Sequence, residues 1–143
     1  GKGNAYDLVG NRANGIEPGK RPLSSMSPTF VESEEGVLVL GTPGGSRIIS
    51  MVILSVLEHL SNLGSDPKNI VALPRYHHQY LPDRVQIEPE SFNQSWISSL
   101  EALGHKVQVY RRKWGNMQAI YCDKYTYKCV TLNDPRGKAG VVF

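Results

Sequence analysis

The stretch from Gly41 to Gly64 joins a glycine-rich turn to a long amphipathic segment, and it constrains the fold more than any other part of the sequence. After Gly44-Gly45, apolar residues recur at the i, i+3, i+4 spacing of one helix face. They are Ile48, Ile49, Val52, Ile53, Val56, Leu57, Leu60 and Leu63. We expect a helix with this continuous stripe buried, with Ser46 capping its first turn and Gly64 ending it.

The Gly44-Gly45 pair stands directly before this helix, where the available chemistry is that of the backbone. Two residues without side chains let backbone N–H groups approach a bound atom closely. The partial positive charge of a helix N-terminus adds to these groups and favours a carboxylate, a phosphate or a developing oxyanion. The alternative is a plain tight turn, because glycine pairs before helices are common. The local sequence leaves both interpretations open.

The composition is that of one ordinary globular domain. Of 143 residues, 40% are hydrophobic, and 16 basic against 13 acidic residues give a formal net charge of +3. Charges are scattered apart from Arg111-Arg112-Lys113, so we predict no nucleic-acid binding. No apolar run is long enough to span a bilayer. The sequence opens on Gly1 without an initiating methionine, so we expect a fragment or a processed subunit.

The remaining patterns predict strands and helices in mixed order. We expect a hairpin of strands 29–32 and 37–41 around a turn at 34–36. After the long helix, residues 65–67 predict the capped start of a short second helix that ends near Leu73. Further along we expect a strand at 85–88, a helix at 92–103 ended by Gly104, and strands at 106–111, 117–122 and 128–132. Short connections favour antiparallel pairing, so we predict an α+β fold.

Residues 1–22 show no sustained periodicity, and we predict a loop or an extended arm there. The arm leads into a polar stretch bracketed by Pro22 and Pro28, in which Ser24 and Ser25 offer hydroxyls and amides side by side. Such groups can bind a carboxylate. The alternative is a serine-rich turn whose hydroxyls satisfy its own backbone.

Two further polar clusters are candidates for chemistry. The His77-His78 pair invites a metal, but neighbouring side chains of an extended segment point to opposite faces. We therefore expect imidazole and aromatic packing there, and we predict no metal site and no cofactor. The run that begins at Asn133 is a polar turn that either positions Asp134 and Arg136 or only ends the sheet.

Cys122 and Cys129 flank six residues between two strand-like runs. If these runs form a hairpin with Tyr125-Thr126 at its tip, the two cysteines lie directly opposite and can form a disulfide. Tyr-Thr is unfavourable in a two-residue turn, however, so the register and the bridge stay open. Two cysteines alone cannot complete a zinc site.

Four of these motifs follow one another along the chain in a fixed order. They are Arg21-Pro-Leu-Ser-Ser-Met-Ser-Pro-Thr, Gly41-Thr-Pro-Gly-Gly-Ser-Arg-Ile-Ile, Pro74-Arg-Tyr-His-His-Gln-Tyr-Leu-Pro-Asp and Asn133-Asp-Pro-Arg. Taken together, they resemble the C-terminal part of the small subunit of γ-glutamyltransferases. The resemblance extends over nearly the whole of residues 1–143 and implies a single, incomplete domain.

The resemblance implies an N-terminal-nucleophile hydrolase fold, an αββα sandwich of two antiparallel sheets between helix layers. In that family a precursor cleaves itself into a large and a small subunit, and the new N-terminal threonine attacks a γ-glutamyl amide such as that of glutathione. The γ-glutamyl group then passes to water or to an amino acid or peptide acceptor. By motif, Ser24 and Ser25 would bind the α-carboxylate of this group, and Gly44 and Gly45 would supply the oxyanion-hole amides.

The nucleophile of that family is not matched in this sequence. Gly1 is not a nucleophile, and Thr29, Thr42, Thr126 and Thr131 are internal and outside the matching motif. The resemblance therefore implies that the large subunit and the preceding part of the small subunit are partners, and that this chain alone is inactive. It also implies a periplasmic or extracellular location, which permits a disulfide. The alternatives are a related acylase or poly-γ-glutamate depolymerase, and a binding module without catalysis.

Overall fold

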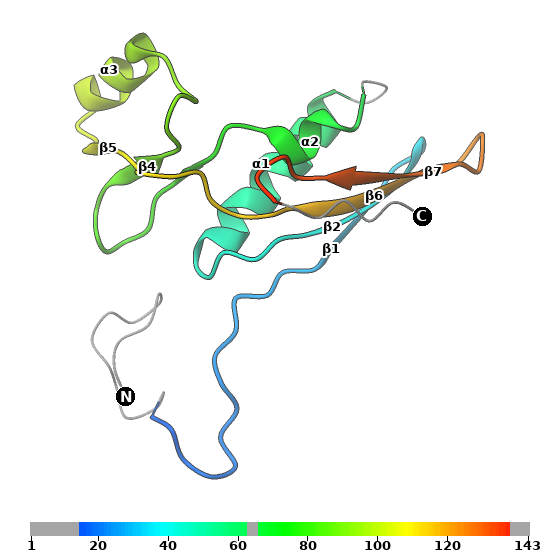
Figure 1. Cartoon of the computed structure of the whole chain (residues 1–143), viewed down its shortest axis with the longest axis horizontal. Coiled ribbons are helices and arrows are strands. Elements are labelled where there is room, and N and C mark those ends of the chain that lie inside the picture. The colour runs from blue at the N-terminus through cyan, green and yellow to red at the C-terminus, as the bar shows by residue number, and fades with distance from the viewer. Residues whose placement is uncertain (1–14, 63–65, 138–143) are drawn as a thin grey trace.

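A four-stranded antiparallel sheet forms the centre of the structure, a computed structural model that describes residues 15–62 and 66–137 (Figure 1). Its strands lie in the order β1-β2-β6-β7, so β1 and β7 are the edge strands. The strands are β1 (Thr29–Glu32), β2 (Gly36–Gly41), β6 (Gln118–Asp123) and β7 (Cys129–Asn133). Of the predicted arm, residues 1–14 lie outside the described part, and residues 15–28 run away from the sheet without a strand or helix.

The predicted β1-β2 hairpin is confirmed, with Thr29 opposite Leu40 and Glu32 opposite Val37. Its turn is closed by Ser33, whose backbone N–H donates to the Gly36 carbonyl and whose hydroxyl oxygen accepts from the Gly36 N–H. Serine hydroxyls often close turns by bonding to the backbone a few residues along the chain.

The β6-β7 hairpin places Cys122 opposite Cys129, and the two form a disulfide. The bond from the Asp123 N–H to the Lys128 carbonyl closes the hairpin, so residues 124–127 form a loop that is longer than a two-residue turn. The Asp123 carboxylate accepts from the N–H groups of Tyr125 and Thr126 and orders the loop. The register that Tyr-Thr left open is therefore fixed by an aspartate at the end of the strand.

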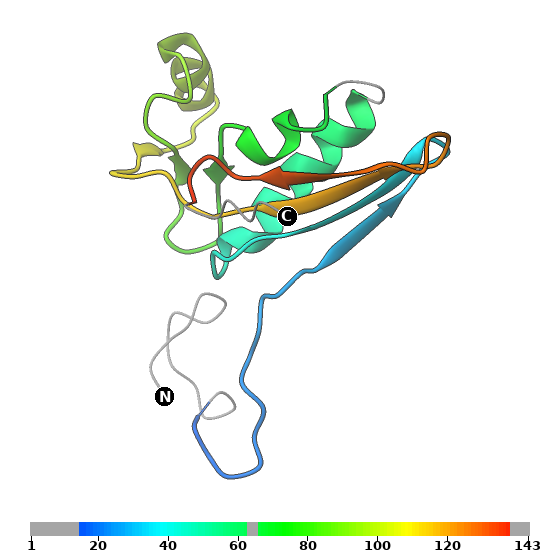
Figure 2. The same cartoon turned by 45° about the vertical axis from the view of Figure 1, so that its right-hand side comes forward.

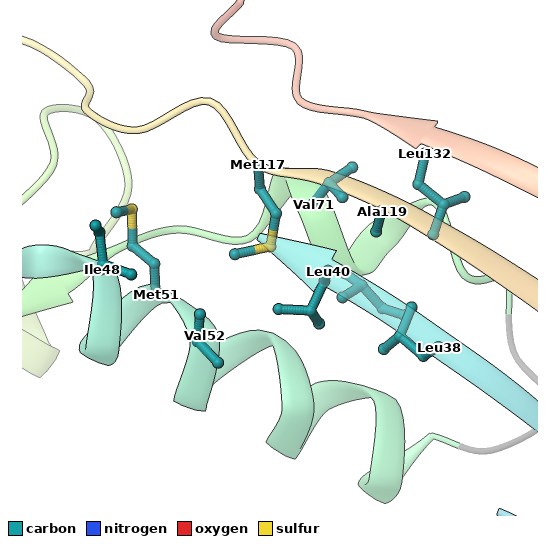
Figure 3. Packing of buried hydrophobic residues seen from close by; sticks show 10 residues of the cluster. Leu38, Leu40, Ile48, Met51, Val52, Val71, Met117, Ala119 and Leu132 are labelled. Carbon is teal, nitrogen blue, oxygen red and sulfur yellow. The ribbon is translucent and has the colours of Figure 1, made fainter. Parts of the chain in front are cut away.

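Two helices cover one face of this sheet: α1 (Arg47–Ser61) and the short α2 (Asn69–Ala72) (Figure 2). The core lies between them and the sheet, and Figure 3 shows side chains of α1, β2 and β6 pointing into it. Its most deeply buried members are Leu38, Met51 and Met117, each no more than 1% exposed. Within the described residues, no helix is long and apolar enough to cross a membrane.

The long helix differs from the prediction in two ways. Its apolar stripe is split, because the face with Ile48 and Val52 is buried against the sheet while the neighbouring residues point outward. The outward residues are Ile49, Ile53, Leu57 and Leu60, each between 44% and 55% exposed. Ser46 stands at the N-cap position, but its side chain makes no capping bond, because its backbone is helical instead of extended; its hydroxyl donates to Gln79. Gly64 and Ser65 lie outside the described residues.

A smaller sheet in the order β3-β4-β5 lies beside the first one (Figure 1). Its elements are β3 (Tyr76–His77), β4 (Val85–Ile87) and β5 (Val107–Val109), with α3 (Gln94–Ala102) between β4 and β5. The pair β4-β5 is parallel, so the expectation of antiparallel pairing throughout is wrong for this sheet. The reason is the intervening helix, which returns the chain to the end where β4 began, as in other parallel crossovers.

The outer face of the four-stranded sheet, away from the helices, carries an apolar patch. Phe30, Val39 and Ile120 lie side by side across β1, β2 and β6 on this face. Phe30 is 72% exposed and Ile120 is 45% exposed. Because a soluble sheet that stands alone would carry polar residues there, this face has the composition of one that packs on another layer.

A buried ion-pair network joins the ends of both sheets. Arg75, which precedes β3, meets Asp134, which follows β7, with a nitrogen to oxygen distance of 2.5 Å. Arg136 donates to both carboxylate oxygens of Glu88, which follows β4, at 2.8 and 2.5 Å. The side chains of Arg75, Glu88 and Asp134 are at most 3% exposed. Of the two sequence alternatives, the structure therefore shows that the polar turn positions Asp134 and Arg136.

Hydrogen bonds hold Asp134 in its charged form. Burial alone would raise the pKa of this carboxyl, but the N–H groups of Arg136 and Met117 and the Arg75 guanidinium outweigh burial and lower it. Because the folded pKa lies below the ordinary aspartate value, the stability from this group is complete above that value. It is lost only as the pH falls through the lowered pKa.

We predict that Asp134→Asn lowers the free energy of unfolding by about 3–5 kcal/mol, because it leaves the Arg75 guanidinium buried without its carboxylate. Chemical denaturation followed by circular dichroism measures this. The matched control is Asp83→Asn, which removes an exposed carboxylate paired with His78 and should leave stability nearly unchanged. Equal effects of the two substitutions would contradict the role given to the network.

Candidate functional site

The Gly44-Gly45 turn begins α1 with backbone geometry that depends on glycine. The Gly44 carbonyl accepts from the Arg47 N–H, and the Gly45 carbonyl from the Ile48 N–H, each at 3.2 Å. Gly45 has φ of 59°, in the left-handed region that favours glycine. A Cβ on Gly44 would lie 2.5 Å from the Met51 Cε, so a side chain there would displace the end of this buried methionine.

The backbone of this turn is exposed to solvent. Gly44 and Gly45 are both exposed, and within the described part of the chain no hydrogen bond occupies their N–H groups. A Cβ placed on Gly45 would meet nothing within 4 Å. Two amides that have no hydrogen-bond partner among residues 15–62 and 66–137 thus precede a 15-residue helix, an arrangement that suits an anion.

Ser24 and Ser25, predicted as a separate carboxylate site, lie next to this turn. The Ser25 hydroxyl donates to the Gly45 carbonyl at 2.8 Å, across twenty positions of sequence. The Ser24 hydroxyl oxygen accepts from the Met26 N–H at 3.2 Å, which is the local serine turn that the sequence also allowed. The structure thus brings together the two predicted parts of the site, with the Ser24 side chain exposed beside them.

A hydrogen-bonded chain behind the turn was not predicted as part of the site. The Ser46 hydroxyl donates to the Gln79 side-chain oxygen at 2.9 Å, and the same oxygen lies 2.9 Å from the Nε2 of His77. On its other side, the His77 Nδ1 lies 2.7 Å from the Ser50 hydroxyl. The signal in the sequence was the Pro74 to Asp83 motif, whose polar side chains had no assigned partner until α1 was placed.

The two neighbouring histidines have different environments, as expected for an extended segment. His77 is 5% exposed, and burial lowers its pKa, with a smaller opposing effect from Gln79 and a further lowering by the Arg47 and His78 charges. His78 is exposed and bonds Asp83 at 2.9 Å. Among residues 15–62 and 66–137, no three or more histidine, cysteine, aspartate or glutamate side chains are grouped to hold a metal.

Two aromatic side chains contact Arg47, the first residue of α1. Its guanidinium lies 4.9 Å from the centre of the Tyr110 ring and 5.2 Å from that of Trp114. It also bonds the Gln86 side chain. These contacts fix the first helical residue to the smaller sheet and leave the turn itself open.

A cavity of about 360 Å³ lies at the other end of α1 and is separate from this site. Its lining includes His59, Tyr121 and the acidic residues Glu35 and Asp123. Three hydrogen bonds within the β6-β7 loop already go to one of the two Asp123 carboxylate oxygens, Oδ1. The cavity contains none of the four predicted site residues.

Comparison with known proteins identifies the relatives of this chain. The family model described as Gamma-glutamyltranspeptidase matches residues 1–143. The chain belongs to the gamma-glutamyltranspeptidase family. The Glutathione hydrolase proenzyme of Escherichia coli strain K12 is 43% identical over 118 residues, which are 82% of this chain and 20% of that protein. That of Pseudomonas aeruginosa is 40% identical over 141 residues, 96% of this chain and 25% of that protein.

Solved structures of gamma-glutamyltranspeptidases have the same fold. The T380A mutant of the Helicobacter pylori gamma-glutamyltranspeptidase superposes with a TM-score of 0.80 at 38% identity, covering 96% of this chain and 74% of that chain. The family resemblance and the α+β, N-terminal-nucleophile hydrolase fold expected from the motifs are therefore confirmed. The chain spans about a fifth to a quarter of the length of these two gamma-glutamyltranspeptidase relatives.

We predict that Gly45→Ala destabilises the complete protein by about 1–2 kcal/mol, because a side chain in the left-handed region strains the backbone even in open space. Chemical denaturation measures the change in the free energy of unfolding. The control is Gly41→Ala in β2, where a Cβ also meets nothing but the backbone is ordinary. That substitution should be neutral or slightly stabilising; an equal loss at both positions would exclude backbone strain as the cause.

Proposed function

We propose that this chain forms the carboxylate-binding and oxyanion side of a γ-glutamyltransferase active site. The enzyme would cleave γ-glutamyl amides such as glutathione and transfer the γ-glutamyl group to water or to an amino acid or peptide acceptor. The observation that carries the proposal is the Ser25 to Gly45 hydrogen bond, because it joins the two groups that one γ-glutamyl substrate would need at its two ends. Family membership supports the reaction class.

The α-carboxylate of the substrate would be bound by Ser24 and Ser25. The Ser24 hydroxyl is exposed and its oxygen already accepts from the Met26 N–H, so its own proton remains available to donate. Ser25 would donate to the substrate through its backbone N–H or by turning its hydroxyl from the Gly45 carbonyl. Hydrogen bonds to a charged group are stronger than neutral ones, which suits this role.

The scissile carbonyl would place its oxygen against the amides of Gly44 and Gly45. Negative charge develops on that oxygen as a nucleophile adds to the carbonyl carbon. Two fixed N–H donors and the helix N-terminus stabilise the charge without moving, which lowers the barrier. Removing one such donor typically costs about 3 kcal/mol in transition-state stabilisation.

The remaining groups of the active site would come from outside these 143 residues. We propose a threonine nucleophile in the preceding part of the small subunit, and a large subunit as partner. The apolar outer face with Phe30, Val39 and Ile120 supports a second sheet stacked on this one, as in an αββα sandwich. We also propose an extracytoplasmic location, which the Cys122–Cys129 disulfide supports.

In the complete enzyme, we predict that Ser24→Ala combined with Ser25→Ala raises the KM for a γ-glutamyl anilide at least tenfold, since each lost bond to a charged group is worth about 1.5–3 kcal/mol. Steady-state kinetics measures this. Ser98→Ala in α3 removes an exposed serine hydroxyl outside the site and serves as the control. An unchanged KM in the double variant would exclude the carboxylate role.

A second prediction separates the γ-glutamyltransferase from an acylase of the same fold. We expect the γ-glutamyl anilide to be turned over at least a hundredfold faster, in kcat/KM, than the glutaryl anilide, which keeps the terminal carboxylate but lacks the α-amino group. A site that also bonds the α-ammonium is left with unpaired acceptors by the glutaryl substrate, and such rejection is strong. Equal turnover of the two anilides would favour the acylase.

A further inference from the structure

The oxyanion turn is an exposed segment that must hold two amides in one direction. Neither Gly44 nor Gly45 has a side chain to fix it, and both are exposed. Among the described residues, the side chains of two other segments form hydrogen bonds at this turn. Ser25 bonds the Gly45 carbonyl from the arm, and Gln79 bonds the Ser46 hydroxyl from the Pro74 to Asp83 segment.

The hydrogen-bond directions at Gln79 follow from its partners. Its side-chain nitrogen donates to the Leu81 carbonyl, which can only accept, so its oxygen is the group that faces Ser46 and His77. That oxygen can only accept, and His77 must therefore carry its proton on Nε2. The Nδ1 of the neutral ring then accepts from the Ser50 hydroxyl, which belongs to the second turn of α1.

The chain of bonds therefore contacts α1 at two points on successive turns. Ser46 and Ser50 are four residues apart and lie on one side of the helix, where Gln79 and His77 each bond one of them. Because His77 is buried and Gln79 is held by the Leu81 carbonyl, the segment cannot rotate freely about either contact. Two contacts fix the rotation of the first turn of the helix as well as its position.

We propose that Gln79 is a positioning residue for the oxyanion hole, acting through Ser46, with His77 and Ser50 holding Gln79 in place. The inference rests on the function proposed above for Gly44 and Gly45. Gln79 does not touch the substrate in this role. It accepts from the Ser46 hydroxyl, ties the residue directly after the glycine pair to the Pro74 to Asp83 segment, and so fixes the direction of the turn amides.

The expected consequence is a loss in kcat with little change in KM. A displacement of catalytic donors by about 1 Å can cost on the order of a hundredfold in rate. The α-carboxylate contacts at Ser24 belong to another segment and contribute to substrate binding in the ground state. An effect confined to the oxyanion would therefore appear in the chemical step, whereas general loosening of the site would raise KM as well.

The test uses the complete, processed enzyme with the γ-glutamyl anilide as substrate. Gln79→Met keeps the length of the side chain and removes both polar groups. We expect kcat to fall at least tenfold, with KM within about threefold of the wild type. Gln79→Glu keeps the acceptor for Ser46 and His77 but loses the N–H that donates to the Leu81 carbonyl, so it should restore only part of the loss. The matched control is Gln108→Met, which removes a glutamine whose side chain accepts from Arg84 and lies on β5.

A double-mutant cycle keeps the proposal falsifiable if Gln79→Met is not processed. Ser46→Ala removes only the hydroxyl at the other end of the bond and should also lower kcat. If the two residues act through one bond, the double variant is no worse than Gln79→Met, and the Ser46→Ala loss is absent in that background. If Gln79→Met cannot be obtained, the cycle is run with Gln79→Ala.

Each outcome decides the proposal. An unchanged kcat in Gln79→Met or in Ser46→Ala overturns the positioning role, as does an additive double variant or a kcat loss matched by Gln108→Met. A wild-type enzyme that does not turn over the γ-glutamyl anilide would overturn the proposed function itself, and the positioning role with it. Active wild type with unaffected variants would leave the proposed function standing and remove only the role of Gln79.

Discussion

The buried pairs Arg75–Asp134 and Arg136–Glu88 are the interaction on which the rest of the structure depends. Their charges come from the ends of both sheets, which share few other contacts. Arg75 also donates to the Val71 carbonyl at the end of α2, and Arg136 to the Leu73 carbonyl. The network therefore sets where the chain leaves α2 and enters the Pro74 to Asp83 segment. A buried pair of this kind contributes less to stability than to a unique arrangement, because its desolvation offsets much of its attraction.

That arrangement matters because the segment held by Arg75 carries the residues that contact α1. His77 follows Arg75 by two positions, and Gln79 follows His77 by two, so they share one side of the extended chain. The same alternation sends Tyr76 to the other side, where its ring meets Phe92 and Trp96. One short segment thus connects the ion network to the first turn of α1 and to the aromatic contacts of α3. The position of the buried Arg75 therefore also determines where His77 and Gln79 meet the start of α1.

The sequence predicted the parts of the fold that local patterns determine. The β1-β2 hairpin follows from alternation around the turn at 34–36, and α3 from its spacing, although the start of α3 is set by Asn93, whose side chain caps the helix by accepting from the Trp96 N–H. The apolar stripe of α1 gave the helix but overstated its burial. Helical spacing shows that a face is apolar, but it does not show whether a neighbouring layer belongs to the same 143 residues. The parallel β4-β5 pair was missed because strand direction depends on where the intervening helix returns the chain.

The candidate site divides in the same way. Gly44, Gly45, Ser24 and Ser25 could be named from motifs, because glycine and serine at those spacings have a local meaning. Their mutual contact could not, since the Ser25 to Gly45 bond spans twenty residues and depends on the path of the arm. Ser46 shows the limit most clearly, because its position predicted a cap and its hydroxyl instead serves Gln79, thirty-three residues away. A cap requires an extended backbone at Ser46, and the helical backbone found there instead directs the hydroxyl to the acceptor that packing brings into reach.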